Sequence, residues 1–281
     1  MRVDAHQHVW NLDRVSYPWI PSDDPVLHRN IEAEELEPLI AAAGTDRTVL
    51  VQAASSDEET PYLLETADRF PWVGAVVAWV PLTDPEGTGR RLETLSRHPK
   101  VRGVRHQIHD EPNPDWVVQD RVVESLKVVA AFGLTFDVVA VWPNHLRHVP
   151  TLAERVPDLG LVIDHLAKPP IAGGGLHPWA EELGRAAKAS PRVSAKVSGL
   201  HTAADPDMRG AKDLEPYVDW AFECFGPDRL MFGSDWPVLN LAGDYARVWR
   251  ETVAIVGRYG PEAQRAILGG TAARVYRIGP V

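Results

Sequence analysis

The feature that most constrains the fold of this chain is a repeated alternation of short apolar segments with longer segments of helical periodicity. The short segments are continuously apolar, which is typical of parallel strands that are buried on both faces of a sheet. Strands with one solvated face would instead alternate apolar and polar residues. We expect eight strands, at residues 2–5, 48–53, 73–80, 101–107, 135–141, 160–164, 193–197 and 230–232.

Between these segments, apolar residues recur every three or four positions, which is the pattern of a helix with one buried face. The segment 32–43, for example, places Leu36, Leu39 and Ile40 on one face and is followed by Gly44, a residue type that commonly ends helices. The other helices are expected at residues 60–70, 84–96, 119–132, 144–155, 178–189, 214–225, 242–259 and 261–268.

Eight strands that alternate with helices are the number that a (β/α)8 barrel requires. An open, doubly wound sheet is the alternative, but it would be expected to carry a glycine-rich turn after its first strand, and this sequence has none there. Barrels of this type commonly reach about 250 residues as one domain. We therefore expect an α/β protein with a (β/α)8 TIM barrel, as a single domain over residues 1–281.

Charge and composition narrow the classes of function. The 29 Lys and Arg residues against 39 Asp and Glu residues leave a formal net charge of −10, which disfavours nucleic acids and anionic membrane surfaces as partners. The single cysteine, Cys224, excludes an internal disulfide framework and a cysteine-rich metal site. We see no apolar signal segment and no apolar stretch near the roughly 20 residues of a membrane span. We expect a cytoplasmic protein that acts on a small molecule, with a homo-oligomer left open.

Histidines and a carboxylate fall at the ends of the expected strands. His6 and His8 are two residues apart, so their side chains point to the same side of the first strand. His165 follows the sixth strand and Asp235 follows the eighth. Taken singly, each has a structural explanation, such as a buried histidine with internal partners or an aspartate in a turn. Because the C-terminal ends of barrel strands surround one pocket, we expect all four side chains to meet there and to act chemically.

Several segments together resemble a known family. They are residues 4–8 (Asp-Ala-His-Gln-His), 17–19 (Tyr-Pro-Trp), 103–106 (Gly-Val-Arg-His), 162–170 (Val-Ile-Asp-His-Leu-Ala-Lys-Pro-Pro), 196–200 (Lys-Val-Ser-Gly-Leu) and 232–237 (Phe-Gly-Ser-Asp-Trp-Pro). The chain resembles the amidohydrolase superfamily (amidohydrolase-related family 2), and within it the sugar-lactonase branch that includes L-fuconolactonases and L-rhamnonolactonases. The resemblance extends over essentially the whole chain. It implies a hydrolase that opens the ester ring of an aldonolactone such as L-fucono- or L-rhamnono-lactone.

For this reaction we expect Asp235 to activate a water molecule, while His6, His8 and His165 polarise the lactone carbonyl. Planar donors and aromatic faces suit the recognition of a polyol. Five such residues lie at or just beyond strand ends and are candidates for substrate binding: Arg105, His106, Trp142, Lys168 and Trp236. The roles of Lys196, Asp137 and His201 stay open.

The residues leave two possibilities for a metal requirement. Binuclear members of the superfamily use a Lys or Glu on the fourth strand and a His on the fifth, whereas here the fourth strand ends Arg-His-Gln and the fifth offers only Asp137. We expect either no required metal or a single divalent ion, such as Zn²⁺, on His6, His8 and Asp235. The alternatives are a lactonase for muconolactone- or pyrone-type substrates, a metal-dependent decarboxylase of the same superfamily, and a non-catalytic sugar-binding barrel.

Overall fold

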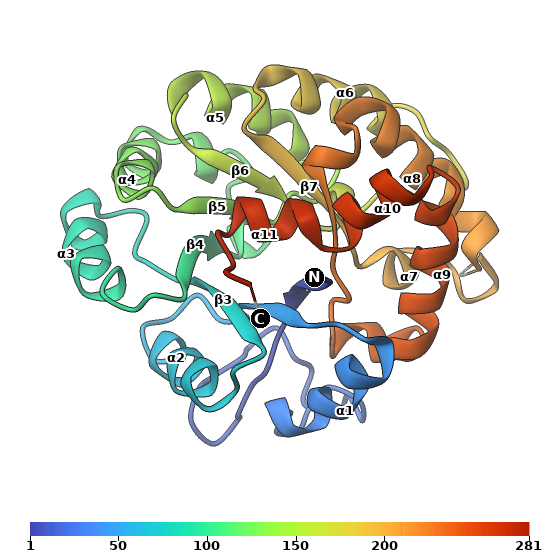
Figure 1. Cartoon of the computed structure of the whole chain (residues 1–281). Coiled ribbons are helices and arrows are strands. Elements are labelled where there is room, and N and C mark those ends of the chain that lie inside the picture. The colour runs from blue at the N-terminus through green and yellow to red at the C-terminus, as the bar shows by residue number, and fades with distance from the viewer. Residues whose placement is uncertain (209, 281) are drawn as a thin grey trace.

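The strands form a parallel barrel. The structure is a computed structural model that describes residues 1–208 and 210–280. Strands that follow each other in the chain are neighbours in one eight-stranded sheet. Gln7 of the first strand forms a bridge with Trp236, which follows the last strand, and this nearly closes the barrel (Figure 1). The strands are β1 (Val3–Gln7), β2 (Arg47–Val51), β3 (Val73–Ala78), β4 (Val101–His106), β5 (Thr135–Val138), β6 (Gly160–Ile163), β7 (Val193–Val197) and β8 (Leu230–Phe232).

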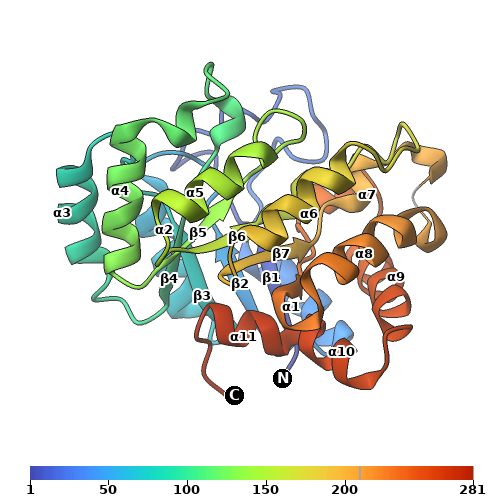
Figure 2. The same ribbon diagram turned by 90° about the horizontal axis from the view of Figure 1, so that it is seen from above.

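Helices surround the strands, and Figure 2 places both termini at one end of the barrel. The short C-terminal helix lies across this end (Figure 1). The helices are α1 (Ala33–Ala43), α2 (Glu59–Arg69), α3 (Pro85–Leu95), α4 (Asp120–Ala131), α5 (Val149–Arg155), α6 (Trp179–Ala189), α7 (Leu200–Ala203), α8 (Ala211–Phe225), α9 (Tyr245–Gly257), α10 (Pro261–Arg265) and α11 (Thr271–Val275).

The core has an outer and an inner part. The outer part packs the apolar faces of the helices against the strands. The inner part lies inside the barrel, where small and β-branched residues such as Val49 and Val77 pack together with Ala272 and Tyr276, which enter from the C-terminal segment. The C-terminal segment therefore closes one end of the barrel, and the opposite end is left for a site.

The predicted (β/α)8 barrel is confirmed. Strands β2, β3 and β5 end two or three residues earlier than predicted, because the chain leaves the sheet there to form loops. Helices α7 and α11 were not predicted, since segments of four and five residues carry too few turns for a periodic signal.

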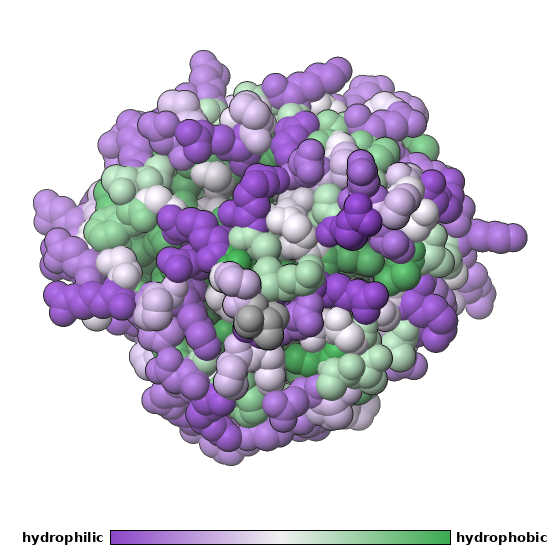
Figure 3. All heavy atoms as spheres, in the orientation of Figure 1, coloured by the Kyte–Doolittle hydropathy of each residue, from purple (hydrophilic) through white to green (hydrophobic). Residues whose placement is uncertain are grey.

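The surface at the end that carries the termini is mostly hydrophilic, with small separate apolar areas (Figure 3). Within the two ranges that the structure describes, every helix is too short or too polar to cross a bilayer.

Candidate active site

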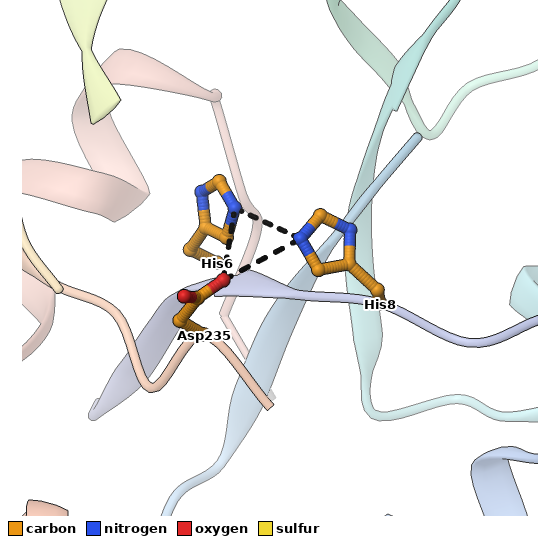
Figure 4. Close-up of side chains that lie close together, drawn as sticks. All are labelled: His6, His8 and Asp235. Carbon is orange, nitrogen blue, oxygen red and sulfur yellow. Dashed lines mark hydrogen bonds and ion pairs between the residues drawn. The ribbon is translucent and has the colours of Figure 1, made fainter. Parts of the chain in front are cut away.

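His6 of β1 and His8, which directly follows this strand, meet Asp235, which follows the last strand (Figure 4). The Nε2 atoms of His6 and His8 are 3.1 Å apart. The Oδ1 atom of Asp235 lies 3.7 Å from His6 Nε2 and 3.6 Å from His8 Nε2. His165 reaches the same carboxylate, with its Nε2 atom 3.9 Å from Oδ1. The structure thus brings together all four side chains that the sequence placed at strand ends, and each is buried.

The backbone around Asp235 depends on contacts with the first strand. The amide of Asp235 donates to the carbonyl of His6 at 2.8 Å, and its φ of 62° is in the left-handed region. Gly233 is required nearby because a Cβ at this position would lie 2.7 Å from the Cβ of His6. The buried Asp4 joins both segments, since its Oδ1 atom accepts from the amides of His6 at 3.1 Å and Ser234 at 2.8 Å.

His165 begins a left-handed turn. Four consecutive non-glycine residues, His165 to Lys168, have φ values of 54°, 49°, 61° and 51°, a conformation that disfavours side chains with a Cβ. The turn is stabilised by the Trp179 indole, which donates to the carbonyl of Leu166 at 2.8 Å. A Cβ on Gly199 would lie only 2.7 Å from His165 Nδ1, so glycine makes room for the imidazole. This turn aims His165 at Asp235.

Beneath His6 lies a fully buried group of charges. The Lys196 ammonium is 2.6 Å from Asp137 Oδ2 and 3.0 Å from Asp164 Oδ1, and its Nζ atom is 3.0 Å from His6 Nδ1. Arg105 contacts the other oxygen of Asp164 at 3.1 Å. Two cations and two carboxylates balance each other, as buried charges require.

The protonation states follow from burial and neighbouring charge. Burial lowers the pKa values of His6, His8 and His165, in the case of His165 to about 4. Burial alone would raise the pKa of Asp235, but His165, and then His8 and His6, hold it below its usual value. Neutral imidazoles therefore face an ionised carboxylate, which can accept a proton or bind a cation.

Two predicted substrate-binding residues are largely engaged within the protein. Arg105 donates from Nε and from one terminal nitrogen to the side chain and carbonyl of Gln52, at 3.3 and 2.5 Å, in addition to its contact with Asp164. The Nδ1 atom of His106 accepts from the Trp79 indole at 3.1 Å, so its Nε2 donates to Glu111 at 2.7 Å. Both side chains support the walls of the site.

The other three predicted substrate-binding residues differ in exposure. Trp236 is buried, and its carbonyl accepts from the amide of His8 at 2.7 Å. Lys168 is exposed at the end of the left-handed turn. Trp142 is partly buried, and its indole nitrogen has no hydrogen-bond partner within the described parts of the chain. Lys168 and Trp142 are thus freer to contact a ligand than Arg105, His106 or Trp236.

Several residues of the site were missed in the sequence. In the sequence, Asp4 is only the first residue of the Asp-Ala-His-Gln-His motif, whereas in the structure it joins β1 to the segment after β8. His109 was not considered because it lies in an irregular segment. His109 Nε2 lies 3.5 Å from Asp110 Oδ1, and partial burial, followed by the charges of Lys168 and Arg105, lowers the pKa of His109 to about 3. A histidine three residues beyond a strand end was the available signal. His201, which was left open, pairs with Glu251 at 2.8 Å.

Cavities lie at both ends of the barrel. One of about 480 Å³ is beside Met1, Arg2 and Trp249, at the end that carries the termini and away from the histidines. Another of about 350 Å³ lies at the site end, between loops that follow β1, β2 and β4. This cavity lies at the same end of the barrel as the histidines: its wall includes Ala54, three residues beyond Val51, and the carbonyl of Val51 accepts from His8 Nδ1 at 2.7 Å. Its polar and aromatic lining includes Trp19, Ser55, Ser56, Gln107, Asp110, Glu111 and His106, which was predicted to bind substrate.

The residues present fit a single divalent metal. His6, His8 and Asp235 offer ligand atoms within 4.8 Å of one another. The ligands of a tetrahedral zinc ion lie about 3.4 Å apart, and the separations here are 3.1, 3.6 and 3.7 Å. Because His8 Nδ1 donates to a carbonyl, its Nε2 lone pair points into the site. A second set, His6, Asp164 and His165, satisfies the same distance limit.

Known proteins with the same fold are found by sequence and by structure. The amidohydrolase family matches residues 3–278. An L-fucono-1,5-lactonase of Burkholderia ambifaria is 39% identical over 283 residues, and one of Burkholderia multivorans is 36% identical over 294; each alignment covers 99% of this chain and 96% of the relative. A crystal structure of a B. multivorans amidohydrolase with bound HEPES superposes on this chain with a TM-score of 0.89 at 34% identity and covers 99% of this chain and 100% of that one. A second crystal structure of a B. multivorans amidohydrolase, with bound zinc, has a TM-score of 0.88. The chain belongs to the amidohydrolase family.

Proposed function

We propose that this protein is a lactonase that hydrolyses the ester ring of a sugar lactone. The observation that carries the proposal is the convergence of Asp235 with His6, His8 and His165 in one buried site, from three separate segments of the chain. The relatives named L-fucono-1,5-lactonase, which align over almost the full length, support a sugar lactone as the substrate class.

In the proposed reaction, Asp235 accepts a proton from a water molecule as the water oxygen attacks the lactone carbonyl carbon. An imidazole N–H donates to the carbonyl oxygen as it becomes negative; one such donor is typically worth about 3–4 kcal/mol. The tetrahedral intermediate then collapses, the bond from carbon to ring oxygen breaks, and Asp235 returns the proton to that oxygen. A divalent ion on His6, His8 and Asp235 would, when bound, supply further polarisation of the carbonyl.

The cavity at the site end of the barrel favours a neutral polyhydroxylated substrate. The carboxylates of Asp110 and Glu111 can accept hydrogen bonds from hydroxyl groups, and Trp19 offers an indole to a sugar face. The same carboxylates would repel a substrate with two negative charges. Lys168 and Trp142 complete the recognition from the opposite loops. We therefore favour a neutral aldonolactone, with L-fucono-1,5-lactone as the first compound to test, over a dicarboxylate lactone.

The test is a pH-indicator assay that follows acid release from a panel of lactones, with purified protein before and after dialysis against a chelator. The panel contains L-fucono-1,5-lactone, an L-rhamnonolactone and a pyrone dicarboxylate, and each rate is compared with spontaneous hydrolysis. We expect acceleration for the neutral lactones only. A preference for the dicarboxylate, or binding of lactones without acceleration, would overturn the proposal.

A further inference from the structure

The Lys196 ammonium lies between two carboxylates and the imidazole of His6. A lysine ammonium carries three N–H donors and no lone pair. Its three close partners are Asp137 Oδ2 at 2.6 Å, Asp164 Oδ1 at 3.0 Å and His6 Nδ1 at 3.0 Å. The side chain is fully buried. Its contacts with Asp137 and His6 have hydrogen-bond geometry, whereas the contact with Asp164 is an ion pair, because Asp164 Oδ1 has no hydrogen-bond partner within the described residues. The contact with His6 requires a lone pair on Nδ1, and the ring proton of a neutral His6 must then be on Nε2.

The competing contacts of His6 are longer. Asp164 Oδ1 lies 3.3 Å from Nδ1 and would favour a proton on that nitrogen. A terminal nitrogen of Arg105 lies 3.4 Å from Nε2 and would favour a lone pair there. Both distances exceed the usual 2.7–3.2 Å of N–H hydrogen bonds, whereas the contact with Lys196 lies within it.

The partner of His6 Nε2 agrees with this tautomer. His8 Nδ1 donates to the carbonyl of Val51 at 2.7 Å, so His8 Nε2 carries a lone pair. This lone pair is 3.1 Å from His6 Nε2, where it can accept the ring proton of His6. Donors and acceptors therefore alternate without conflict from Lys196 through His6 and His8 to Val51.

We infer that Lys196 is a positioning residue that holds His6 as its Nε2–H tautomer in the metal-free protein. In this form the Nε2–H of His6 donates to His8, and Nε2 has no lone pair for a metal ion. A metal ion could use His6 Nε2 only after the ring proton moves to Nδ1, where it would face the ammonium. Lys196 therefore favours His6 as a donor and weakens metal binding. The inference rests on the proposed site but not on its substrate.

The first test needs no substitution. In metal-free protein labelled with ¹⁵N-histidine, long-range ¹H–¹⁵N correlations distinguish a protonated ring nitrogen from one with a lone pair, and loss of the signal in a His6→Asn variant assigns it. We expect the proton of His6 on Nε2. A proton on Nδ1 would overturn the inference.

The second test measures metal affinity. Removing Lys196 alone would leave buried carboxylates unpaired, which is strongly destabilising, so the variant is Lys196→Met/Asp137→Asn, which removes one charge of each sign. The matched control, Lys168→Met, removes an exposed ammonium from the same end of the barrel. Zn²⁺ affinity is determined by competition with a chromophoric chelator.

The double variant should bind Zn²⁺ on the order of ten- to a hundredfold more tightly than wild type, the range expected from one charge-assisted hydrogen bond. The control should shift the affinity by less than about threefold, since an exposed charge is screened. Equal affinities of the double variant and wild type, or an equal gain in the control, would contradict the inference. Both measurements are made without substrate. A result that contradicts the inference about Lys196 would therefore leave the lactonase proposal standing, and a protein without lactonase activity could still confirm the inference. If the double variant does not fold, the tautomer of His6 measured in the wild-type protein tests the inference by itself.

Discussion

Replacing Asp235 by asparagine should abolish most of the activity and leave the fold intact. An amide cannot accept the proton of the attacking water, and a positioned general base typically contributes about 10²–10⁴ to the rate, or about 3–5 kcal/mol of transition-state stabilisation. The expected change in stability is small, within about 1 kcal/mol. The imidazole nitrogens lie 3.6–3.9 Å from Oδ1, beyond ordinary hydrogen-bond length. The backbone contact with His6 remains, and asparagine tolerates the left-handed φ of 62° well.

The assay compares kcat/KM for the lactone that the panel identifies, by release of acid, with thermal unfolding of the same preparations. Asp244→Asn is the matched control. Asp244 caps helix α9 by accepting from the amide of Arg247 at 2.8 Å, and asparagine caps helices about equally well. This control should keep both activity and stability. If folded Asp235→Asn protein hydrolyses the lactone within about tenfold of the wild-type rate, Asp235 is not the base and the proposed reaction is refuted.

Three further predictions concern the supports of the site. Burial raises the pKa of Glu59 from 4.5 to about 7, although it accepts from the amides of Ala53 and Ala54; the folded protein therefore holds this proton more tightly than the unfolded chain. The free energy of unfolding of wild type relative to Glu59→Gln should fall by about 2–3 kcal/mol between pH 5 and pH 8, and a constant or rising difference in denaturant titrations would contradict this. Ala167→Gly should change the free energy of unfolding by less than about 1 kcal/mol, because relief of its φ of 61° offsets the lost methyl group. The control Ala254→Gly, in the exposed middle of α9, should lower the free energy of unfolding by about 1 kcal/mol. Equal losses in the two variants would argue against strain in the turn. Gly199→Ala should displace His165 and lower kcat/KM about tenfold or more. Gly174 has a similar φ of 66°, but a Cβ there would meet no described atom within 4 Å, so Gly174→Ala should leave kcat/KM within about twofold. The same loss in both variants would show that contact with His165 is not the cause.

The sequence by itself determined the architecture and the position of the chemistry. Continuously apolar strand segments alternating with helices require a buried parallel sheet, and eight of them predict a barrel. In such a barrel, a residue just beyond a strand end must lie at one common edge. This topological rule needs no knowledge of side-chain contacts, which is why His6, His8, His165 and Asp235 could be placed together from their positions in the chain alone.

The tertiary structure alone decided which partner each side chain has. Lys196 contacts His6 across 190 residues of sequence, and Asp4 contacts Ser234 across 230. Such contacts depend on the register and tilt of the strands, which set the depth at which each side chain enters the barrel, and periodicity carries no information on depth. The left-handed turn of His165 to Lys168 also opposes local preference. It is held by distant contacts, such as that of the Trp179 indole, and only the folded barrel provides them.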